Sequence, residues 1–367
     1  MSGRLRARRR ATPCLVEVPT AHFADARMGP IHRRFFSTLL SAMAARQLRP
    51  QLIEVPHGAD EAQRTPLPGA VHFAYHCFGP ARPGLRRVKC SSVAGHYDVD
   101  SMGFSGWSSL ALEAERHRPL WQALDLDEAR ASVSALHEDL RARNASKFTQ
   151  AETPFEVDEP FVFLPLQTTN DRVVELFRLP FLDALDAAIA AARPGRRLVI
   201  KRHPLCRSRR VAVRLRGLRR HPHVTVTDAS IHAIMPRAAL VLVGNSGVGF
   251  EALLAGRPVA TFAQAEYQAV TRQLHGAADI RAVFEDEIRH DPDEAVRFVH
   301  YKMTRAAVGV DDGAALGRLL DEALDEAWAA RAAAGSASAA RIMPEGVPAF
   351  RATLVQAART GRGGAPG

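Results

Sequence analysis

Short apolar runs alternate with segments of helical spacing between residues 161 and 262. The apolar runs have the length of buried strands, and breaks such as Pro194-Gly195 end the helical segments. We expect strands at residues 161–166, 197–201, 224–227, 239–243 and 259–262. We expect helices at residues 171–193, 208–220 and 248–255. Strands that alternate with helices predict an α/β fold with a parallel, doubly wound sheet.

The first part of the chain has a weaker pattern of the same kind. Strands are expected at residues 14–18, 52–55 and 71–75, and helices at residues 31–46, 127–143 and 314–334. Residues 96–106 are expected to form a loop. We place a domain boundary in the polar, proline-containing linker at residues 144–158. The predicted organisation is a disordered basic tail at 1–12, domains at 13–150 and 151–334, and a flexible Ala/Gly/Ser-rich tail at 335–367.

The net charge of +10 is unevenly spread along the chain. Residues 196–220 hold eleven Lys or Arg and no acid. Three interpretations stay open for this block: a solvated helix face, a surface that meets anionic membrane lipid or glycan, and a nucleic-acid site. Few aromatic residues lie among the arginines, so nucleic acid is the least favoured of the three.

The remaining composition favours a cytoplasmic location. No stretch is apolar enough for a transmembrane helix, and no signal-peptide core follows the basic N-terminus. The four cysteines are scattered without disulfide or zinc-site spacing. We therefore expect a cytoplasmic protein, with the block at 196–220 as the surface that could touch the inner face of the cell membrane.

Polar clusters directly follow three of the predicted strands. They are Gln167-Thr168-Thr169-Asn170-Asp171, Lys201-Arg202-His203-Pro204, and Gly244-Asn245-Ser246-Gly247 with Glu251 one turn later. Ligands of doubly wound sheets bind at the carboxyl ends of the strands. A Lys and His pair suits a phosphate oxygen, and a glycine turn that opens a helix offers N–H groups to the same phosphate. The clusters therefore predict a phosphate site.

Two acidic residues of these clusters have alternative interpretations. Asp171 either caps the following helix or projects into the cleft as a nucleophile or charge stabiliser. Glu251 either reaches a ribose hydroxyl or faces solvent.

A fourth cluster, at residues 96–108, is rich in polar and small side chains of the kind that line clefts. Asp98 and Asp100 have no matching third ligand, so we expect no metal site. Trp107 is either a packing residue or a platform on which a sugar stacks. Glu113 follows at helical distance as a candidate general acid or a solvated helix residue.

These motifs resemble those of the capsule polysaccharide biosynthesis glycosyltransferases, which include retaining β-Kdo transferases. Gln167…Asp171 resembles the group's Q-P-x-x-D-like element, with Thr168 in place of the proline. Lys201-x-His203-Pro204 resembles its K-x-H-P element. The other similar stretches are Gly103-Phe104-Ser105-Gly106-Trp107-Ser108-Ser109-Leu110 and Asn245-Ser246-x-x-Gly249-Phe250-Glu251-Ala252-Leu253 with Gly256-x-Pro258-Val259. Together they span roughly residues 95–270.

The resemblance implies a GT-B-like pair of Rossmann-type domains with parallel sheets, the first on the acceptor side and the second binding the nucleotide sugar. It implies CMP-Kdo as donor, a glycan or glycolipid acceptor, and neither metal nor cofactor. His203 and Ser246 would contact the CMP phosphate, supported by Lys201 and Asn245, and Asp171 would be the nucleophile. Gln167, Gly247 and Glu251 complete the expected donor site, and Glu113 is the second catalytic candidate.

Two alternatives stay open. The donor could be a UDP- or GDP-sugar on the same fold, or the chain could be a non-catalytic glycan-binding module of polysaccharide export.

Overall fold

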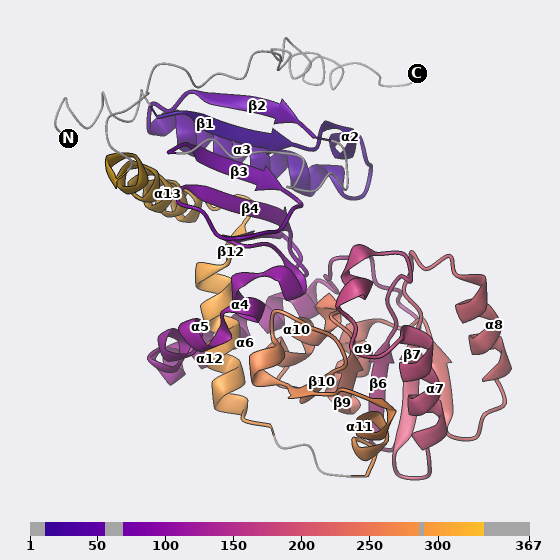
Figure 1. The fold of residues 1–367 in the computed structure, drawn as a ribbon. Helices are drawn as coiled ribbons and strands as arrows, with labels where there is room; N and C mark the ends of the chain where they lie inside the picture. Colours follow the sequence, from indigo (N-terminus) through magenta and orange to yellow (C-terminus); the bar gives the residue numbers. More distant parts are fainter. Residues whose placement is uncertain (1–11, 56–68, 286–289, 334–367) are drawn as a thin grey trace, which may run out of the picture. The chain divides into compact units, whose positions relative to one another are not determined.

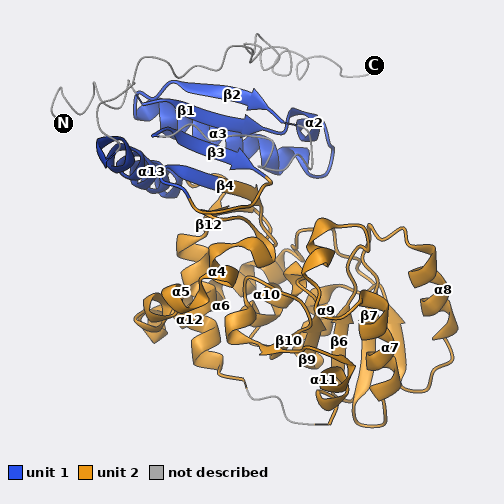
Figure 2. Cartoon of the chain, viewed as in Figure 1, with its two compact units in different colours: residues 1–75, 82–86, 313–367 blue, residues 76–81, 87–312 orange. Residues whose placement is uncertain are grey.

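The computed structural model describes residues 12–55, 69–285 and 290–333 (Figure 1). The predicted tails lie outside these ranges except for Thr12. The chain divides into two compact units (Figure 2). Unit 1 comprises residues 1–75, 82–86 and 313–367, and unit 2 comprises residues 76–81 and 87–312. None of the helices in the described ranges is both long and apolar enough to span a bilayer.

Unit 1 contains three parallel strands. Strand β1 (Cys14–Val18) lies between β2 (Pro50–Glu54) and β3 (Val71–Tyr75). All five residues of β1 are buried, and four of them are apolar, with Glu17 the exception. The unit's helices are α2 (Thr20–Phe23), α3 (Gly29–Ala45) and α13 (Gly313–Ala333). Helices α3 and α13 pack on each other, and an ion pair at 2.8 Å joins Arg46, at the end of α3, to Asp321 of α13.

Three further strands are antiparallel, which the sequence did not predict. Strand β4 (Leu85–Cys90) begins in unit 1 and continues in unit 2, where it pairs with β5 (His96–Asp100). Strand β5 also pairs with β12 (Ala307–Gly309). Buried charged side chains hide the apolar pattern of β4; the Arg87 guanidinium, for example, donates to the carbonyl of Pro80 at 3.0 Å. The expected loop at 96–106 is therefore a strand over its first five residues.

The main sheet of unit 2 is six-stranded and wholly parallel, as predicted. Its strands are β6 (Phe161–Pro165), β7 (Arg197–Lys201), β8 (Val224–Thr227), β9 (Ala238–Val243), β10 (Val259–Thr261) and β11 (Arg272–Gln273). The spatial order is β8-β7-β6-β9-β10-β11. The direction of winding reverses between β6 and β9, and such a switch point is where doubly wound sheets bind ligands.

Helices cover both faces of this sheet (Figure 1). Phe161 and Phe163 of β6 pack with helices on one face, and Val162 and Leu164 pack with helices on the other. The first set is α5 (Ala114–Gln122), α6 (Leu126–Ala142), α10 (Gly247–Leu254) and α12 (Pro292–Arg305). The second set is α7 (Phe181–Ala191), α8 (Arg209–Gly217) and α11 (Ala277–Ala282). The short elements are α4 (Ser109–Leu112), α9 (Ile231–Ile234), η2 (Ser105–Trp107), η3 (Arg172–Leu176), η4 (Met235–Arg237) and η5 (Gln268–Val270).

The single helix predicted at 171–193 is instead two elements, the 3-10 helix η3 and the α-helix α7. Pro180, the N-cap of α7, is the physical reason. A proline disfavours helical backbone in the residue before it, so the chain cannot continue as one helix through Leu179.

The linker at 144–158 does not separate the two compact units, because it lies within unit 2. Helices α5 and α6, which precede the linker, pack on α12, which follows the sheet. The Trp121 ring meets the Phe298 ring edge-on at 5.3 Å, and Arg130 pairs with Asp293 at 2.8 Å. After residue 86 the chain returns to unit 1 only at α13. No local sequence pattern indicates this connection.

Candidate functional site

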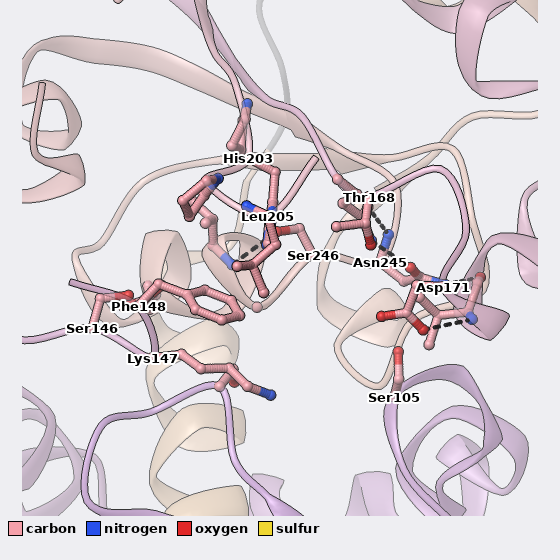
Figure 3. A pocket seen from close by; sticks show the side chains of 18 of the residues that line it. Ser105, Ser146, Lys147, Phe148, Thr168, Asp171, His203, Leu205, Asn245 and Ser246 are labelled. Atoms are coloured by element: carbon pink, nitrogen blue, oxygen red, sulfur yellow. Dashed lines mark hydrogen bonds between the residues drawn. The ribbon is translucent and has the colours of Figure 1, made fainter. Parts of the chain in front are cut away.

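A cavity of about 240 Å³ lies in unit 2 at the carboxyl ends of β6, β7 and β9 (Figure 3). All the residues that line it belong to unit 2. The three polar clusters that follow these strands in the sequence meet there, and they are joined by residues of β4, β5 and the segment at 146–150. The expectation that strand-end clusters converge at one site therefore agrees with the structure.

Gln167 and Asn245 bridge the switch point between β6 and β9. The Gln167 side-chain amide donates to Asn245 Oδ1 at 3.0 Å, and the Asn245 backbone N–H donates to Gln167 Oε1 at 3.1 Å. The Asn245 side-chain nitrogen donates to the carbonyls of Val173 at 2.9 Å and Gln264 at 3.2 Å. Both amides are buried and largely occupied by protein partners. They hold the strand ends together, and the parts expected of Gln167 and Asn245 in the donor site stay predictions.

Asp171 lies at the start of η3, where one carboxylate oxygen accepts the backbone N–H of Val173 at 3.3 Å. The residue is exposed and lines the cavity. Figure 3 shows the Ser105 side chain pointing toward the Asp171 carboxylate. Asp171 therefore caps a helix and also borders the cavity, and its role as nucleophile or charge stabiliser stays a prediction.

His203 has an orientation fixed by two neighbours. Its Nδ1 accepts the backbone N–H of Leu205 at 3.1 Å, so in the neutral ring the proton is on Nε2, which is then a donor. The Phe148 ring meets the imidazole edge-on at 4.9 Å. Burial lowers the pKa of His203, and the charge of Asp171 partly offsets this. The histidine can therefore donate a hydrogen bond to a ligand in either protonation state.

Lys201 is more engaged with the protein than the sequence suggested. Its ammonium donates to the carbonyls of Asp228 at 2.8 Å and Ala229 at 2.5 Å. Burial lowers its pKa. Two of its three N–H donors thus tie the end of β7 to the segment after β8, which leaves one for a ligand.

Ser246 and Gly247 begin helix α10 at the cavity wall. Ser246 is the N-cap, and its Oγ accepts the backbone N–H of Val248 at 3.2 Å. A Cβ at Gly247 would lie 2.5 Å from Cβ of Ser92, so only glycine permits this approach. The first N–H groups of α10 carry the positive end of the helix dipole, which attracts an anion.

Glu251 lies farther along α10 and faces the cavity, so the alternative in which it faces solvent is wrong. It is only 6% exposed, and burial raises its pKa to about 8. Ser146 hydrogen-bonds its carboxyl group, and among the described residues Oε1 has no hydrogen-bond partner. Near neutral pH the side chain is therefore a neutral acid with an O–H to donate.

Two lysines of the cavity wall were not predicted. Lys89 of β4 has its ammonium 3.6 Å from the centre of the Phe104 ring, and Lys147 donates to the carbonyl of Cys90 at 3.2 Å. Burial, helped by repulsion from Lys147, lowers the pKa of Lys89 to about 7.

A compositional signal could have found these lysines. The chain has 49 Lys and Arg, of which only Lys89, Lys147, Lys201 and Lys302 are lysines. Three of the four line the cavity, and the fourth contacts a residue that does.

Lys302 forms a buried ion cluster beside the cavity. It is 1% exposed, and its Nζ lies 2.6 Å from Glu266 Oε1 and 3.4 Å from Asp98 Oδ1. The two carboxylates raise the pKa of Lys302 against the opposing effect of burial. Both carboxylate residues line the cavity, and they share this one ammonium as their ion-pair partner.

Hydrogen bonds to the Asp100 carboxylate hold the loop after β5 in place. The Asp100 carboxylate accepts backbone N–H groups from Met102 at 2.6 Å and Gly103 at 2.8 Å, and the Ser109 hydroxyl at 2.6 Å. Trp107 stacks on Phe78 at 4.2 Å and is not part of the cavity lining, so packing is the interpretation that the structure supports.

Glu113 is not brought to the cavity. It lies between α4 and α5 and pairs with Arg116 at 2.9 Å. The solvated helix residue is the interpretation that fits this position.

The basic block at 196–220 folds as β7, a turn and α8. Val211 and Leu215 are buried against the sheet, and Arg214 pairs with Asp186. The other arginines of α8 are exposed. Contact with a membrane stays a prediction.

The family described as "Capsule polysaccharide biosynthesis protein" matches residues 113–301, a segment that lies wholly within unit 2. The chain belongs to this family. The matched segment includes Asp171, His203 and Ser246. No curated protein matches the chain.

Several solved structures are similar to the chain. The KpsC β-Kdo 2,4 transferase of Thermosulfurimonas dismutans is 16% identical, with a TM-score of 0.49, and the match covers 84% of this chain and 98% of that one. The KpsC β-Kdo 2,7 transferase of the same organism is 17% identical, with a TM-score of 0.46 and coverages of 84% and 99%. The UDP-GlcNAc 2-epimerase of Methanocaldococcus jannaschii is 8% identical, with a TM-score of 0.31 and coverages of 78% and 98%.

Proposed function

We propose that the protein is a glycosyltransferase of capsular or surface polysaccharide assembly that transfers Kdo, or a related acidic sugar, from a CMP-activated donor with retention of configuration. Membership of the capsule polysaccharide biosynthesis family supports the biological process. The observation that carries the chemistry is the meeting of His203, the start of α10 and Asp171 at one cavity.

The departing CMP gains negative charge on its phosphate as the glycosidic bond breaks. His203 Nε2 and the N–H groups at the start of α10 are fixed donors, held by the Leu205 amide and by the Ser246 cap. Donors that are oriented before the reaction stabilise developing charge without reorganising. These groups supply that stabilisation from the chain's own residues.

Retention requires two displacements at the anomeric carbon. In the first, an Asp171 oxygen bonds to that carbon while the bond to the CMP phosphate oxygen breaks and CMP takes the electron pair. In the second, an acceptor hydroxyl oxygen bonds to the same carbon, Asp171 leaves as a carboxylate, and the hydroxyl proton passes to solvent water. The exposed position of Asp171 on the cavity wall suits this role.

The test measures nucleotide binding by calorimetry in buffer that contains a metal chelator. The wild-type protein should bind CMP more tightly than UDP or GDP. His203→Ala should weaken CMP binding by about 10-fold or more, because a charge-assisted hydrogen bond is lost. His275→Ala, an exposed histidine outside the cavity lining, is the matched control and should leave binding unchanged.

If the protein binds UDP or GDP more tightly than CMP, the proposed donor becomes the corresponding UDP- or GDP-sugar. Binding that needs a metal, or that survives His203→Ala, would refute the phosphate assignment. Binding of CMP without transfer to any acceptor would favour the non-catalytic module.

A further inference from the structure

We propose that Lys89 and Lys147 form the subsite that holds the carboxylate of the donor sugar, and that this lysine pair makes the enzyme select an acidic sugar over a neutral one. The inference rests on the proposed function and adds to it the residues that recognise the sugar. They lie on β4 and on the segment before Phe148, and neither belongs to a strand-end cluster of the main sheet.

The charges around the cavity leave these two lysines without an acidic partner in contact. Asp98 and Glu266 share Lys302 as their ion-pair partner, and Glu251 is held as a neutral acid by burial. Among the described residues, no carboxylate oxygen forms an ion pair with Lys89 or Lys147. The ammonium groups instead lie against the Phe104 ring and the carbonyl of Cys90. A negatively charged group of a ligand could therefore pair with these two lysines.

The position of the lysine pair also fits a carboxylate that is close to the reacting carbon. In a 2-keto sugar acid the carboxylate is bonded directly to the anomeric carbon, so its binding groups must lie near the nucleophile. The charge of Asp171 acts on Lys89. Figure 3 shows Lys147 extending into the cavity toward the side where Ser105 and Asp171 lie.

The phosphate already has other donors at this cavity. His203 Nε2 and the start of α10 serve it, and both are on the strand-end side of the wall. Separate sets of donors for phosphate and carboxylate predict that the two contacts can be removed independently.

The rarity of lysine supports a specific role. A chain that uses arginine for nearly all its basic residues keeps lysine at this cavity. A lysine ammonium is a compact charge with three donors, whereas a guanidinium is broad and planar. Two compact amine groups fit on the wall of a small cavity, and a carboxylate bound there would favour the protonated form of Lys89.

The experiment compares the dissociation constants of CMP, CMP-Kdo and the methyl ester of CMP-Kdo, measured by calorimetry with chelator and without acceptor. Every protein compared carries Asp171→Ala, because an intact Asp171 would form the glycosyl adduct with CMP-Kdo even without acceptor. The variants are Lys89→Met and Lys147→Met, each of which keeps the length and apolar stem of the side chain. Arg210→Met, an exposed residue of α8, is the control. Thermal unfolding of each variant establishes whether it is folded. Because the two lysines are replaced in separate variants, one folded variant is enough for the test.

The Asp171→Ala reference and the control should bind CMP-Kdo at least about 10-fold more tightly than CMP or the ester, as expected for a charge-assisted contact. Both lysine variants should bind CMP within about twofold of the reference and lose the preference for CMP-Kdo. Variants that weaken CMP as much as CMP-Kdo would assign the lysines to the phosphate and overturn the proposal. A preference that survives both substitutions would also overturn it. In each of these cases the proposed function stands, whereas wild type that fails to bind CMP refutes that function itself.

Discussion

Glu251 allows a quantitative prediction of stability, because its carboxyl group is held neutral by burial. The perturbation is Glu251→Gln, which keeps the shape and the hydrogen-bonding capacity and removes the charge. The pKa of the carboxyl rises from 4.5 to about 8 on folding. Below pH 4.5 the group is protonated in both the folded and unfolded states, and it does not affect stability.

Between pH 4.5 and about 8 the unfolded chain releases this proton while the folded protein keeps it. The free energy of unfolding of the wild type therefore falls as the pH rises, and the loss is complete above the folded pKa. At pH 7 the loss from this group approaches about 3 kcal/mol, at 1.36 kcal/mol for each unit between 4.5 and 7. Glutamine has no proton to release, so the variant should gain on the wild type by this amount.

The assay is urea unfolding at pH 5, 6, 7 and 8, followed by tryptophan fluorescence. Both proteins carry Trp328→Phe, which leaves Trp107 and Trp121, both of unit 2, as reporters. Glu152→Gln, at an exposed position, is the control and should show no trend. If the gain from Glu251→Gln does not grow between pH 5 and pH 7, Glu251 is ionised in the folded protein and the reasoning is wrong.

Two further predictions use the same protein. Lys302→Met should lower the free energy of unfolding of unit 2 by about 3–5 kcal/mol, because it leaves the Asp98 and Glu266 carboxylates without a counter-charge. Urea unfolding measures this free energy, and the exposed Arg305→Met is the control. A change below about 1 kcal/mol would contradict the ion cluster. Asp171→Ala should bind CMP like the wild type but transfer sugar about 10⁴-fold more slowly, as expected for loss of a nucleophile. In the same transfer assay Glu113→Gln is the control and should match the wild type. An Asp171→Ala variant with wild-type activity would remove Asp171 from the mechanism.

The main sheet of unit 2 was predictable because its central strands, β6, β9 and β10, are buried on both faces. Such strands appear as unbroken apolar runs, as at Phe161–Pro165, and glycine or proline marks their ends. The parallel order then brings the residues after β6, β7 and β9 to one edge. Asp171, His203 and Ser246 could be grouped from the sequence for this reason alone.

The cavity residues that the sequence did not reveal lie in segments without an unbroken apolar run. Lys89 is on an antiparallel strand whose buried arginines obscure its pattern, and Lys147 is in a linker without regular structure. The division into units was also hidden, since α13 returns to unit 1 through contacts between residues far apart in the sequence. For Gln167 and Asn245 the position was right, but residue type cannot tell whether an amide faces a ligand or another amide.

The pairing of those two amides has a consequence for the proposed reaction. Asn245 precedes Ser246, the cap of α10, and its side chain holds the carbonyl of Val173. The N–H of Val173 in turn holds the Asp171 carboxylate. One buried side chain therefore links the phosphate-binding end of α10 to the nucleophile, across the point where the sheet reverses its winding. A displacement tolerates little error in the distance between nucleophile and leaving group, so in the proposed reaction Asn245 would act by fixing that distance rather than by touching the donor.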